Sequence, residues 1–350
     1  MSAANERQRV RELARQVAQI AAGRANEEIK QRWRDVNALR KPDRAPVWCR
    51  PVGAWPELLP EESLVCTEPW LRSVERRLRR ILIKHDIGDD SPVESSFAVA
   101  AAFDVDPPNV WGVDVARRRP ADAGGAWAYD PPLRSEADFE RLRLPRYTYN
   151  RARTDEALAR AGELLGDILP PRLTCGPPLS ATLCTAAAEL RGLTQMMMDM
   201  ADEPALVHRL MAHLRDGTLR AMEQVAETGL LTPNNVGPMT CSDPLHEPDG
   251  GRVTYKSLWC MANSQEFDQV SPAMWEELCL SYQMPIIERF GLAGYGCCED
   301  LTHKIDAVLS IPNLRIFVCS AWTDLDKVMA ACGTKYVIMW PEGQRRGLPR

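Results

Sequence analysis

The last third of the chain alternates helix and strand patterns, and this alternation constrains the fold more than any other feature. Ser271 opens a predicted helix over 271–290, because serine is a favoured cap at helix N-termini. Apolar strand patterns at 314–319 and 336–340 are separated by a helix pattern at 323–331 that ends before a glycine. Such alternation is typical of parallel βα units, whose ligands collect at the carboxyl ends of the strands. We therefore predict an α/β fold with its site at that edge.

A candidate site lies where the strand that follows the first of these helices runs into a turn. Residues 294–300 read Gly-Tyr-Gly-Cys-Cys-Glu-Asp and place two adjacent thiols, Cys297 and Cys298, directly before Glu299. These side chains at a strand end suit a pocket mouth better than a core. Thiolates are soft ligands that Zn²⁺ stabilises, so zinc binding at Cys297 is one interpretation. A redox or substrate-contact role for the thiol pair is a second interpretation, and plain packing of one thiol is a third.

Amide side chains near other predicted strand ends extend this candidate site. The predicted strand over 255–262 is followed by Asn263 and Gln265, whose amides can hydrogen-bond a substrate. Turn chemistry alone also accounts for the asparagine, because asparagine is common in turns. Asn235 lies in a further loop or strand end over 231–239. These residues would line a site only if the fold brings their strand ends together.

Composition limits the classes of partner. The chain has 350 residues, 45% of them hydrophobic, and a net charge of −5, so it can bury a large core and has no general attraction for nucleic acid. No apolar run reaches the roughly 18 residues that a bilayer span needs, and the N-terminus lacks a signal-peptide pattern. The 11 cysteines are scattered rather than spaced as a disulfide framework. We predict a cytoplasmic protein with no membrane or nucleic-acid partner.

The N-terminal half contributes helices and one predicted strand. Residues 5–39 carry the apolar periodicity of a helical extension, and 45–49 has the pattern of a first strand. A basic helix is predicted over 70–84, and its arginines either mark an acidic ligand or form a solvated helix face, which is the more common role. Residues 117–153 are rich in proline, glycine and aspartate, which predicts a long irregular segment.

Several of these segments together resemble the uroporphyrinogen decarboxylase superfamily. The matching features are Lys-Pro-Asp-Arg-Ala-Pro-Val at 41–47, Gly192 and Asp199 with Asp-Glu-Pro at 202–204, Ser-Pro at 271–272, Tyr-Gly-Cys-Cys-Glu at 295–299 and Ile-Pro-Asn-Leu-Arg at 311–315. The resemblance is densest from Gln265 to Ile338. It implies a (β/α)₈ TIM barrel over 41–341 with an N-terminal helical extension over 1–40, an irregular tail over 342–350, and a site at the carboxyl ends of the barrel strands.

The superfamily divides into two branches with different chemistry. Its decarboxylases bind an acidic tetrapyrrole through an Arg-Gln-Ala-Gly-Arg motif, whereas residues 49–55 here read Cys-Arg-Pro-Val-Gly-Ala-Trp. Its corrinoid-dependent methyltransferases carry a His-x-Cys zinc motif, and here Tyr295 takes the histidine position and Cys297 the cysteine position. Cys319 stands in for the later zinc ligand. The chain is most similar to a Tyr-Gly-Cys-Cys-Glu branch that is nearer to the methyltransferases.

This resemblance implies a methyltransferase-like enzyme that moves a methyl group between a cobamide, free or on a corrinoid protein, and a thiol or folate acceptor. The implied catalytic residues are Cys297, Glu299 and Gln265, and zinc would be held by Cys297 and Cys319. The implied substrate-binding residues are Tyr295, Cys298, Asn263, Trp259, Asn235 and Trp322. A tetrapyrrole decarboxylase and a non-catalytic protein that binds a tetrapyrrole or cobamide are the alternatives.

The C-terminus departs from the resemblance. Relatives continue beyond the strand at 336–340 through another helix and strand, whereas this sequence ends in a basic segment without either pattern. We therefore expect a barrel that lacks its last βα unit. Such a barrel would expose a strand edge, which pairing into a homodimer would cover.

Overall fold

The computed structural model describes residues 3–118, 128–246 and 250–341. Contacts within the chain divide it into two compact units. Unit 1 comprises Met1–Ala102, Asn150–Cys175 and Thr232–Pro244, and unit 2 comprises Phe103–Tyr149, Gly176–Leu231 and Leu245–Arg350. Neither unit begins at residue 41, where the resemblance places the start of the barrel. The predicted tail over 342–350 lies outside the described residues.

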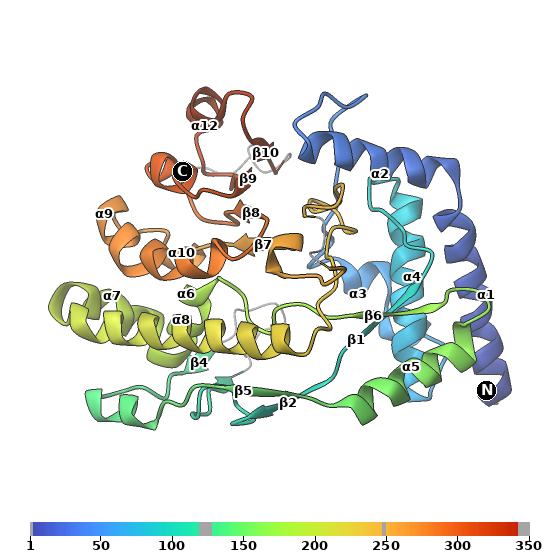
Figure 1. Cartoon of the computed structure of the whole chain (residues 1–350), viewed down its shortest axis with the longest axis horizontal. Coiled ribbons are helices and arrows are strands. Elements are labelled where there is room, and N and C mark those ends of the chain that lie inside the picture. The colour runs from blue at the N-terminus through green and yellow to red at the C-terminus, as the bar shows by residue number, and fades with distance from the viewer. Residues whose placement is uncertain (1–2, 119–127, 247–249, 342–350) are drawn as a thin grey trace. The chain divides into compact units, whose positions relative to one another are not determined.

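Unit 1 is built mainly from helices around one apolar core. Its helices, labelled in Figure 1, are α1 (Ala3–Ala21), α2 (Arg24–Asn37), α3 (Trp55–Leu58), α4 (Pro69–Ile87) and α5 (Arg151–Leu165). A 3₁₀ turn, η1 (Glu61–Ser63), lies between α3 and α4. A two-stranded parallel sheet pairs β1 (Phe97–Ala100) with β6 (Pro171–Thr174). The core side chains come mostly from α1, α4 and α5, among them Val10, Leu13, Leu71, Leu78 and Leu164. The apolar stripe of the first N-terminal helix therefore packs into this core.

Helix α4 begins and ends where local chemistry requires. The Glu68 side chain accepts hydrogen bonds from the backbone N–H groups of Trp70 and Leu71, so it caps the first turn. Gly88 follows the last turn with φ of +77°, a left-handed conformation that favours glycine. The predicted basic helix is confirmed, with bounds slightly wider than the pattern indicated.

The predicted first strand over 45–49 is wrong. The backbone N–H groups of Val47 and Cys49 donate to the carboxylates of Asp90 and Asp89, at 2.7 and 2.9 Å, and not to a neighbouring strand. Asp90 is also held by Arg32 and Arg44. Because side chains satisfy this backbone, an apolar segment that reads as a strand remains irregular.

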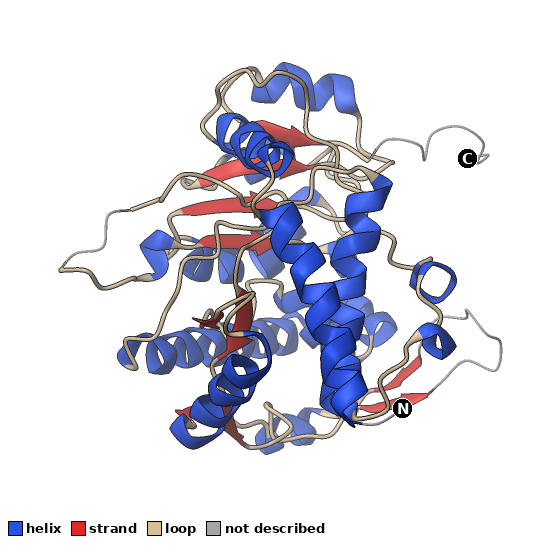
Figure 2. Cartoon of the chain, turned by 90° about the vertical axis from the view of Figure 1, so that its right-hand side faces the viewer, coloured by secondary structure: helices blue, strands red, loops and turns tan. Residues whose placement is uncertain are grey.

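Unit 2 contains the largest sheet, and it confirms the α/β prediction. Four parallel strands lie in the order β10, β9, β8, β7. They are β7 (Trp259–Ala262), β8 (Leu292–Tyr295), β9 (Leu314–Val318) and β10 (Val337–Met339). Figure 2 shows these strands as neighbouring arrows. Along the chain, α11 (Ile305–Leu309) lies between β8 and β9, and α12 (Leu325–Cys332) lies between β9 and β10. Among the described residues the parallel strands form this sheet and the β1–β6 pair, and a complete eight-stranded barrel is not shown.

The helices of unit 2 are more broken than the sequence pattern predicts. The pattern favours two long helices over 179–200 and 204–228, but the first is split by Gly192 into α6 (Leu183–Arg191) and α7 (Leu193–Asp202), while α8 (Pro204–Glu227) is continuous. The helix predicted over 271–290 consists of α9 (Pro272–Trp275), a π-helical turn η5 (Glu276–Leu280) and α10 (Ser281–Ile287).

The remaining elements of unit 2 are short. The predicted irregular segment over 117–153 includes β4 (Ala128–Asp130), η2 (Glu136–Arg141) and β5 (Arg146–Tyr149), and its first residues overlap β3 (Ala116–Arg118). Strand β5 pairs antiparallel with β2 (Phe103–Asp106), and β3 pairs with β4. The 3₁₀ turns η3 (Tyr255–Ser257) and η4 (Gln265–Phe267) flank β7.

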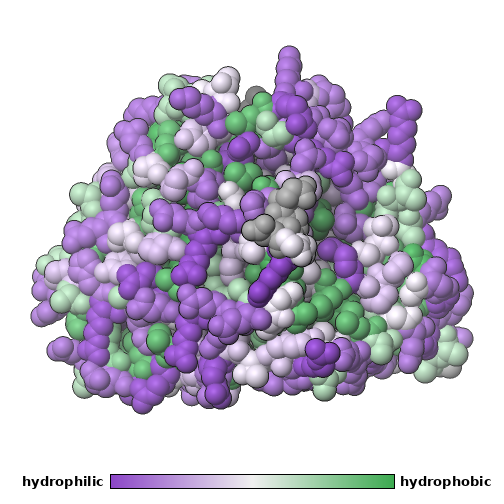
Figure 3. Space-filling view, in the orientation of Figure 1, coloured by the Kyte–Doolittle hydropathy of each residue, from purple (hydrophilic) through white to green (hydrophobic). Residues whose placement is uncertain are grey.

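Helix length and apolar character together decide whether a helix can cross a bilayer. In the described ranges, no helix is both long enough and apolar enough to do so. Figure 3 shows one face of the molecule, on which hydrophilic side chains separate small apolar patches.

Candidate functional site

The thiol pair is presented by a glycine turn at the carboxyl end of β8. Gly296 has φ of +116°, and a Cβ at this position would lie 2.1 Å from the carbonyl oxygen of Val318 on β9. Only glycine can pass so close to the neighbouring strand. The turn leaves Cys297 half-buried and Cys298 exposed, with their sulfur atoms 3.6 Å apart and not joined as a disulfide. The two thiols therefore lie at the open edge of the sheet.

Glu299 lies directly after the thiols but is buried, with 1% of its surface exposed. Its Oε1 accepts a 2.7 Å hydrogen bond from the backbone N–H of Ser264, which follows β7. Burial raises the pKa of the Glu299 carboxyl above its usual value, and hydrogen bonds from backbone N–H groups only partly oppose the increase. The residue thus joins the ends of two neighbouring strands.

Buried acceptor atoms without partners gather at the same edge. Asn263 Oδ1, Glu266 Oε2 and Glu299 Oε2 are buried and have no hydrogen-bond partner in the described part of the chain. All three belong to segments that directly follow β7 or β8. Native proteins rarely leave buried acceptors unsatisfied, so donors from bound water or from a substrate group are expected here. These unsatisfied acceptors support the assignment of a site to this edge, in addition to the two thiols.

The end of β9 is tied to the same turn by hydroxyl groups. Thr323 Oγ1 accepts hydrogen bonds from the backbone N–H groups of Ser320 and Leu301, at 3.2 and 3.4 Å, and donates to the carbonyl oxygen of Glu299 at 3.5 Å. Trp322 lies in this loop with 59% of its surface exposed. The loop therefore exposes the Trp322 ring to solvent, while the hydrogen bonds of the Thr323 hydroxyl hold the loop against the turn after β8.

Beneath the edge, a buried polar chain supports the ends of β7 and β8. Tyr295 is fully buried, and its hydroxyl donates a 2.7 Å hydrogen bond to Oε1 of Gln283 on α10. The Gln283 amide donates to the carbonyl oxygens of Asn263 and Ala181, each at 2.9 Å. Sequence reasoning missed Gln283 entirely. Tyr295 supports the site from inside and has no surface for a substrate to contact.

Sequence reasoning also missed a half-buried polar contact between α6 and η4, the turn that follows β7. Thr185 Oγ1 donates a 2.7 Å hydrogen bond to Oε1 of Glu266. A hydrogen bond with Cys279, together with burial, raises the pKa of the Cys184 thiol. Neither cysteine stands out in the sequence, because both lie in apolar helical patterns and read as core.

The structure brings most of the predicted site residues to one edge. Asn263 and Gln265 follow β7, Cys297, Cys298 and Glu299 follow β8, and Cys319 and Trp322 follow β9. Two predicted residues are placed elsewhere. Trp259 is the first residue of β7, at the opposite end from Asn263, and is 2% exposed. Asn235 belongs to unit 1, where its amide donates to the carbonyl oxygen of Ser242 at 2.8 Å.

The predicted zinc ligands do not form a metal centre on their own. Cys319 is 2% exposed, and burial raises the pKa of its thiol to about 12, because the interior disfavours the charged thiolate. Across the residues that the structure describes, no three His, Cys, Asp or Glu side chains are grouped closely enough to hold a metal ion. The residues present therefore do not fit a zinc site with three protein ligands.

Comparisons with known proteins add little to this geometry. No family model matches the sequence, and no curated protein matches it. Among solved structures, the chain is similar to a methyltransferase from Methanosarcina mazei, with 12% sequence identity and a TM-score of 0.45. The alignment covers 89% of this chain and 81% of that one. At this identity and TM-score, the likeness establishes neither a family nor a reaction.

Proposed function

We propose that unit 2 is a methyltransferase-like enzyme whose site is the edge formed by the carboxyl ends of β7, β8 and β9. The observation that carries the proposal is the combination of two accessible thiols, Cys297 and Cys298, with buried acceptors that lack partners beside them. The Tyr-Gly-Cys-Cys-Glu sequence at 295–299 supports methyl transfer, because it is typical of a branch that is nearer to the corrinoid-dependent methyltransferases than to the decarboxylases. A cobamide, free or on a corrinoid protein, is proposed as one substrate.

The proposed reaction moves a methyl group from cobalt to an acceptor thiol or folate. For a thiol acceptor, the thiol loses its proton to solvent, the cobalt–carbon bond breaks with its electron pair left on cobalt, and a sulfur–carbon bond forms. Cys297 and Cys298 contact the substrate at the edge, and Trp322 supplies an exposed aromatic face for a large ring. Gln265, which is exposed at the end of β7, supplies an amide to orient the substrate.

Glu299 has a positioning role in this proposal. Its carboxylate is buried beneath the thiols and is bonded to the Ser264 backbone, so it fixes the relation between the β7 and β8 ends. The sequence prediction that it is catalytic stays a prediction. Zinc also stays a prediction, which metal analysis of anaerobically purified protein tests, and no chemical role here depends on it.

The decisive experiment is an anaerobic assay of methylcobalamin demethylation with a small thiol and with a folate as alternative acceptors. We expect turnover with one acceptor, reduced by at least about 100-fold in the Cys297→Ala/Cys298→Ala variant, a loss typical when groups at the reacting centre are removed. Cys49→Ala is the matched control, because this half-buried cysteine belongs to unit 1. Its turnover should equal that of the wild type.

Three outcomes would contradict the proposal. Equal turnover by the wild type and the double variant would remove the thiols from the site. Turnover of uroporphyrinogen without methyl transfer would support the decarboxylase alternative. Tight binding of a cobamide without turnover, in correctly folded protein, would support the non-catalytic alternative.

A further inference from the structure

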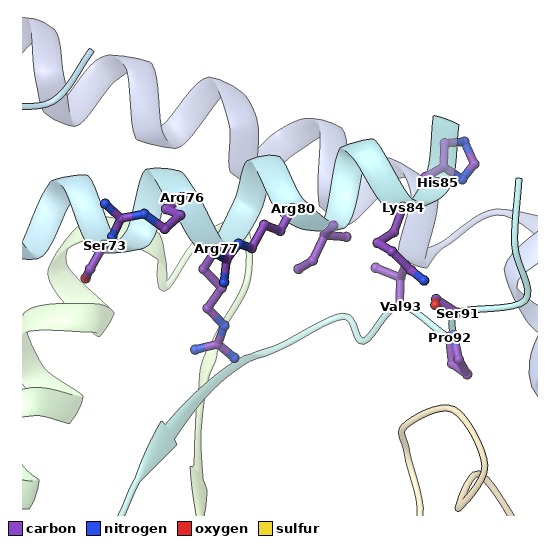
Figure 4. A pocket seen from close by; sticks show the side chains of 10 residues that line it. Ser73, Arg76, Arg77, Arg80, Lys84, His85, Ser91, Pro92 and Val93 are labelled. Carbon is purple, nitrogen blue, oxygen red and sulfur yellow. The ribbon is translucent and has the colours of Figure 1, made fainter. Parts of the chain in front are cut away.

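Unit 1 contains a basic groove along helix α4 that the proposed function does not use. The groove has a volume of about 360 Å³, near the lower limit for small-molecule sites. Figure 4 shows its lining, which comes from one face of α4 and from the segment that leads into β1. The lining residues are Ser73, Arg76, Arg77, Arg80, Ile81, Lys84, His85, Ser91, Pro92 and Val93. All of them belong to unit 1.

Some of these basic side chains are neutralised by acids and others are not. Arg76 pairs with Glu61 at 2.7 Å, and Lys84 pairs with Asp89. Arg77 and Arg80, by contrast, have no carboxylate within 4.0 Å in the described part of the chain. They lie one helical turn apart on the same face of α4, so their side chains are neighbours. The groove therefore carries two guanidinium charges that no acid neutralises.

These two guanidinium groups are held in place by uncharged partners. Arg77 donates a 2.7 Å hydrogen bond to the carbonyl oxygen of Ala98 and lies over the Phe97 ring, 4.2 Å from its centroid. Arg80 lies over the Trp55 ring, at 4.8 Å. Arginine stacked on an aromatic ring keeps N–H groups free at its edge for an anion. Both residues are exposed, and the contacts that their side chains make in the described structure are with uncharged groups and not with a counter-ion.

Apolar side chains complete the lining of the groove. Ile81 comes from α4 itself, Pro92 and Val93 come from the segment that leads into β1, and Val93 is 7% exposed. A free inorganic anion would gain nothing from this aliphatic surface, whereas a ligand with an anionic group and an organic body would contact both the guanidinium groups and the apolar side chains. A phosphate monoester carries a charge of about −1.5 to −2 at pH 7 in one group, which matches two neighbouring guanidinium groups. Guanidinium also binds phosphate through two parallel hydrogen bonds.

We propose that the groove along α4 binds a small organic phosphate, with the phosphate at Arg77 and Arg80 and the organic body against Ile81, Pro92 and Val93. The site is independent of the proposed methyl transfer, because it is made entirely from unit 1. Its ligand is defined by chemistry: one phosphate ester group joined to an apolar or aromatic body of about nucleotide size.

The test is isothermal titration calorimetry of the full chain with adenosine 5′-monophosphate as the probe. Adenosine, inorganic phosphate and citrate are titrated in parallel. We expect adenosine 5′-monophosphate to bind at least tenfold more tightly than each of the other three. The Arg77→Gln/Arg80→Gln variant should weaken its binding at least tenfold. Arg7→Gln/Arg15→Gln removes the same charge from exposed positions on α1 and should bind as the wild type does.

Each alternative result overturns a defined part of the proposal. No binding of adenosine 5′-monophosphate would overturn the proposal. Equal weakening in both double variants would show that the binding is only general electrostatic attraction. Equal binding of inorganic phosphate would remove the apolar side from recognition, and equal binding of citrate would make the groove a carboxylate site. The single variant Arg80→Gln guards against misfolding, because no hydrogen bond of the Arg80 side chain occurs in the described structure. It should weaken binding at least threefold with an unchanged melting temperature.

Discussion

The backbone N–H of Ser264 donates a 2.7 Å hydrogen bond to Oε1 of Glu299, and this bond joins the ends of β7 and β8. The carboxylate that accepts it is buried and has a second oxygen without a partner in the described structure. A buried carboxyl with one unsatisfied oxygen is costly when ionised, because the interior solvates charge poorly. Among the residues at this edge, we therefore expect the protonation of Glu299 to affect the stability of the folded protein most.

Stability should depend on pH through Glu299 with a defined sign. Its pKa is raised in the folded protein, so the folded state binds more protons than the unfolded state between the ordinary carboxyl pKa and the raised value. The contribution of Glu299 to stability is thus fully present below the ordinary pKa and is lost as the pH rises through the raised one. Glu299→Gln cannot ionise, so its melting temperature relative to the wild type should increase from pH 4 to pH 8.

The control is Glu57→Gln, which changes an exposed carboxylate in unit 1. Its melting temperature relative to the wild type should show little change over the same range. A difference for Glu299→Gln that is constant, or that decreases with pH, would show that the carboxyl is not destabilised by ionisation.

The glycine before the thiols should not tolerate a side chain. In Gly296→Ala the new Cβ would lie 2.1 Å from the Val318 carbonyl oxygen in a backbone with φ of +116°. We expect a loss of at least about 3 kcal/mol, since steric overlap adds to the roughly 1–3 kcal/mol of backbone strain. Gly333→Ala is the matched control, because Gly333 has φ of +52° but a Cβ there would meet no atom within 4 Å. Chemical denaturation measures both, and equal losses would contradict the steric argument.

Local signals in the sequence predicted two of the helix ends in unit 2. The Ser271 hydroxyl accepts a hydrogen bond from the Met274 N–H and caps its helix as expected, and Gly333 follows the last turn of α12. The predicted start of α12 at Thr323 was wrong. Asp324 caps this helix, while the Thr323 hydroxyl is bonded to Leu301 and Ser320. Thr323 stands three residues before Asp326, which is the spacing of a helix N-terminal capping box. The sequence does not show that its hydroxyl is bonded elsewhere instead.

The division into two units was not predictable from local patterns. Helix α1 reads as an amphipathic extension, but its Val10 and Leu13 share a core with Leu71 and Leu78 of α4. An apolar stripe shows that a helix has a partner and does not show which one. The prediction that Trp259 lines the site failed for a different reason. Its strand was predicted correctly, but Trp259 is the first residue of that strand, whereas the site lies at the carboxyl end.

The neighbouring thiols should bind a reagent that requires two sulfur atoms. The Cys297 and Cys298 sulfurs are 3.6 Å apart at an accessible turn. A trivalent arsenoxide condenses with two thiols, forming two arsenic–sulfur bonds and releasing water. We expect stoichiometric binding of phenylarsine oxide, weakened at least tenfold in Cys297→Ala and in Cys298→Ala, and unchanged in Cys49→Ala. Intact-protein mass spectrometry would count the adduct, and an unchanged adduct in either site variant would show that the two thiols do not act together.

The buried tyrosine beneath the thiols should contribute to stability through Gln283. Tyr295→Phe removes the hydroxyl that donates to Gln283 Oε1 at 2.7 Å and leaves that oxygen buried without this donor. An unsatisfied buried acceptor costs about 1–3 kcal/mol, so we expect a loss in that range. Tyr336→Phe is the control, because its hydroxyl makes only a 3.5 Å hydrogen bond to the Leu309 carbonyl oxygen and is half-buried. We expect a loss below about 0.5 kcal/mol there.

The sequence did not reveal the hydrogen bond between Tyr295 and Gln283. The π-helical turn at Glu276–Leu280 has a longer period than an α-helix, so it changes the direction in which Gln283 points. The paired variant Tyr295→Phe/Gln283→Leu tests the coupling directly. If the hydrogen bond is the cause, the double variant should lose less free energy of unfolding than the sum of the two single variants, by at least about 0.5 kcal/mol. Additive losses in chemical denaturation would mean that Tyr295 and Gln283 stabilise the edge separately.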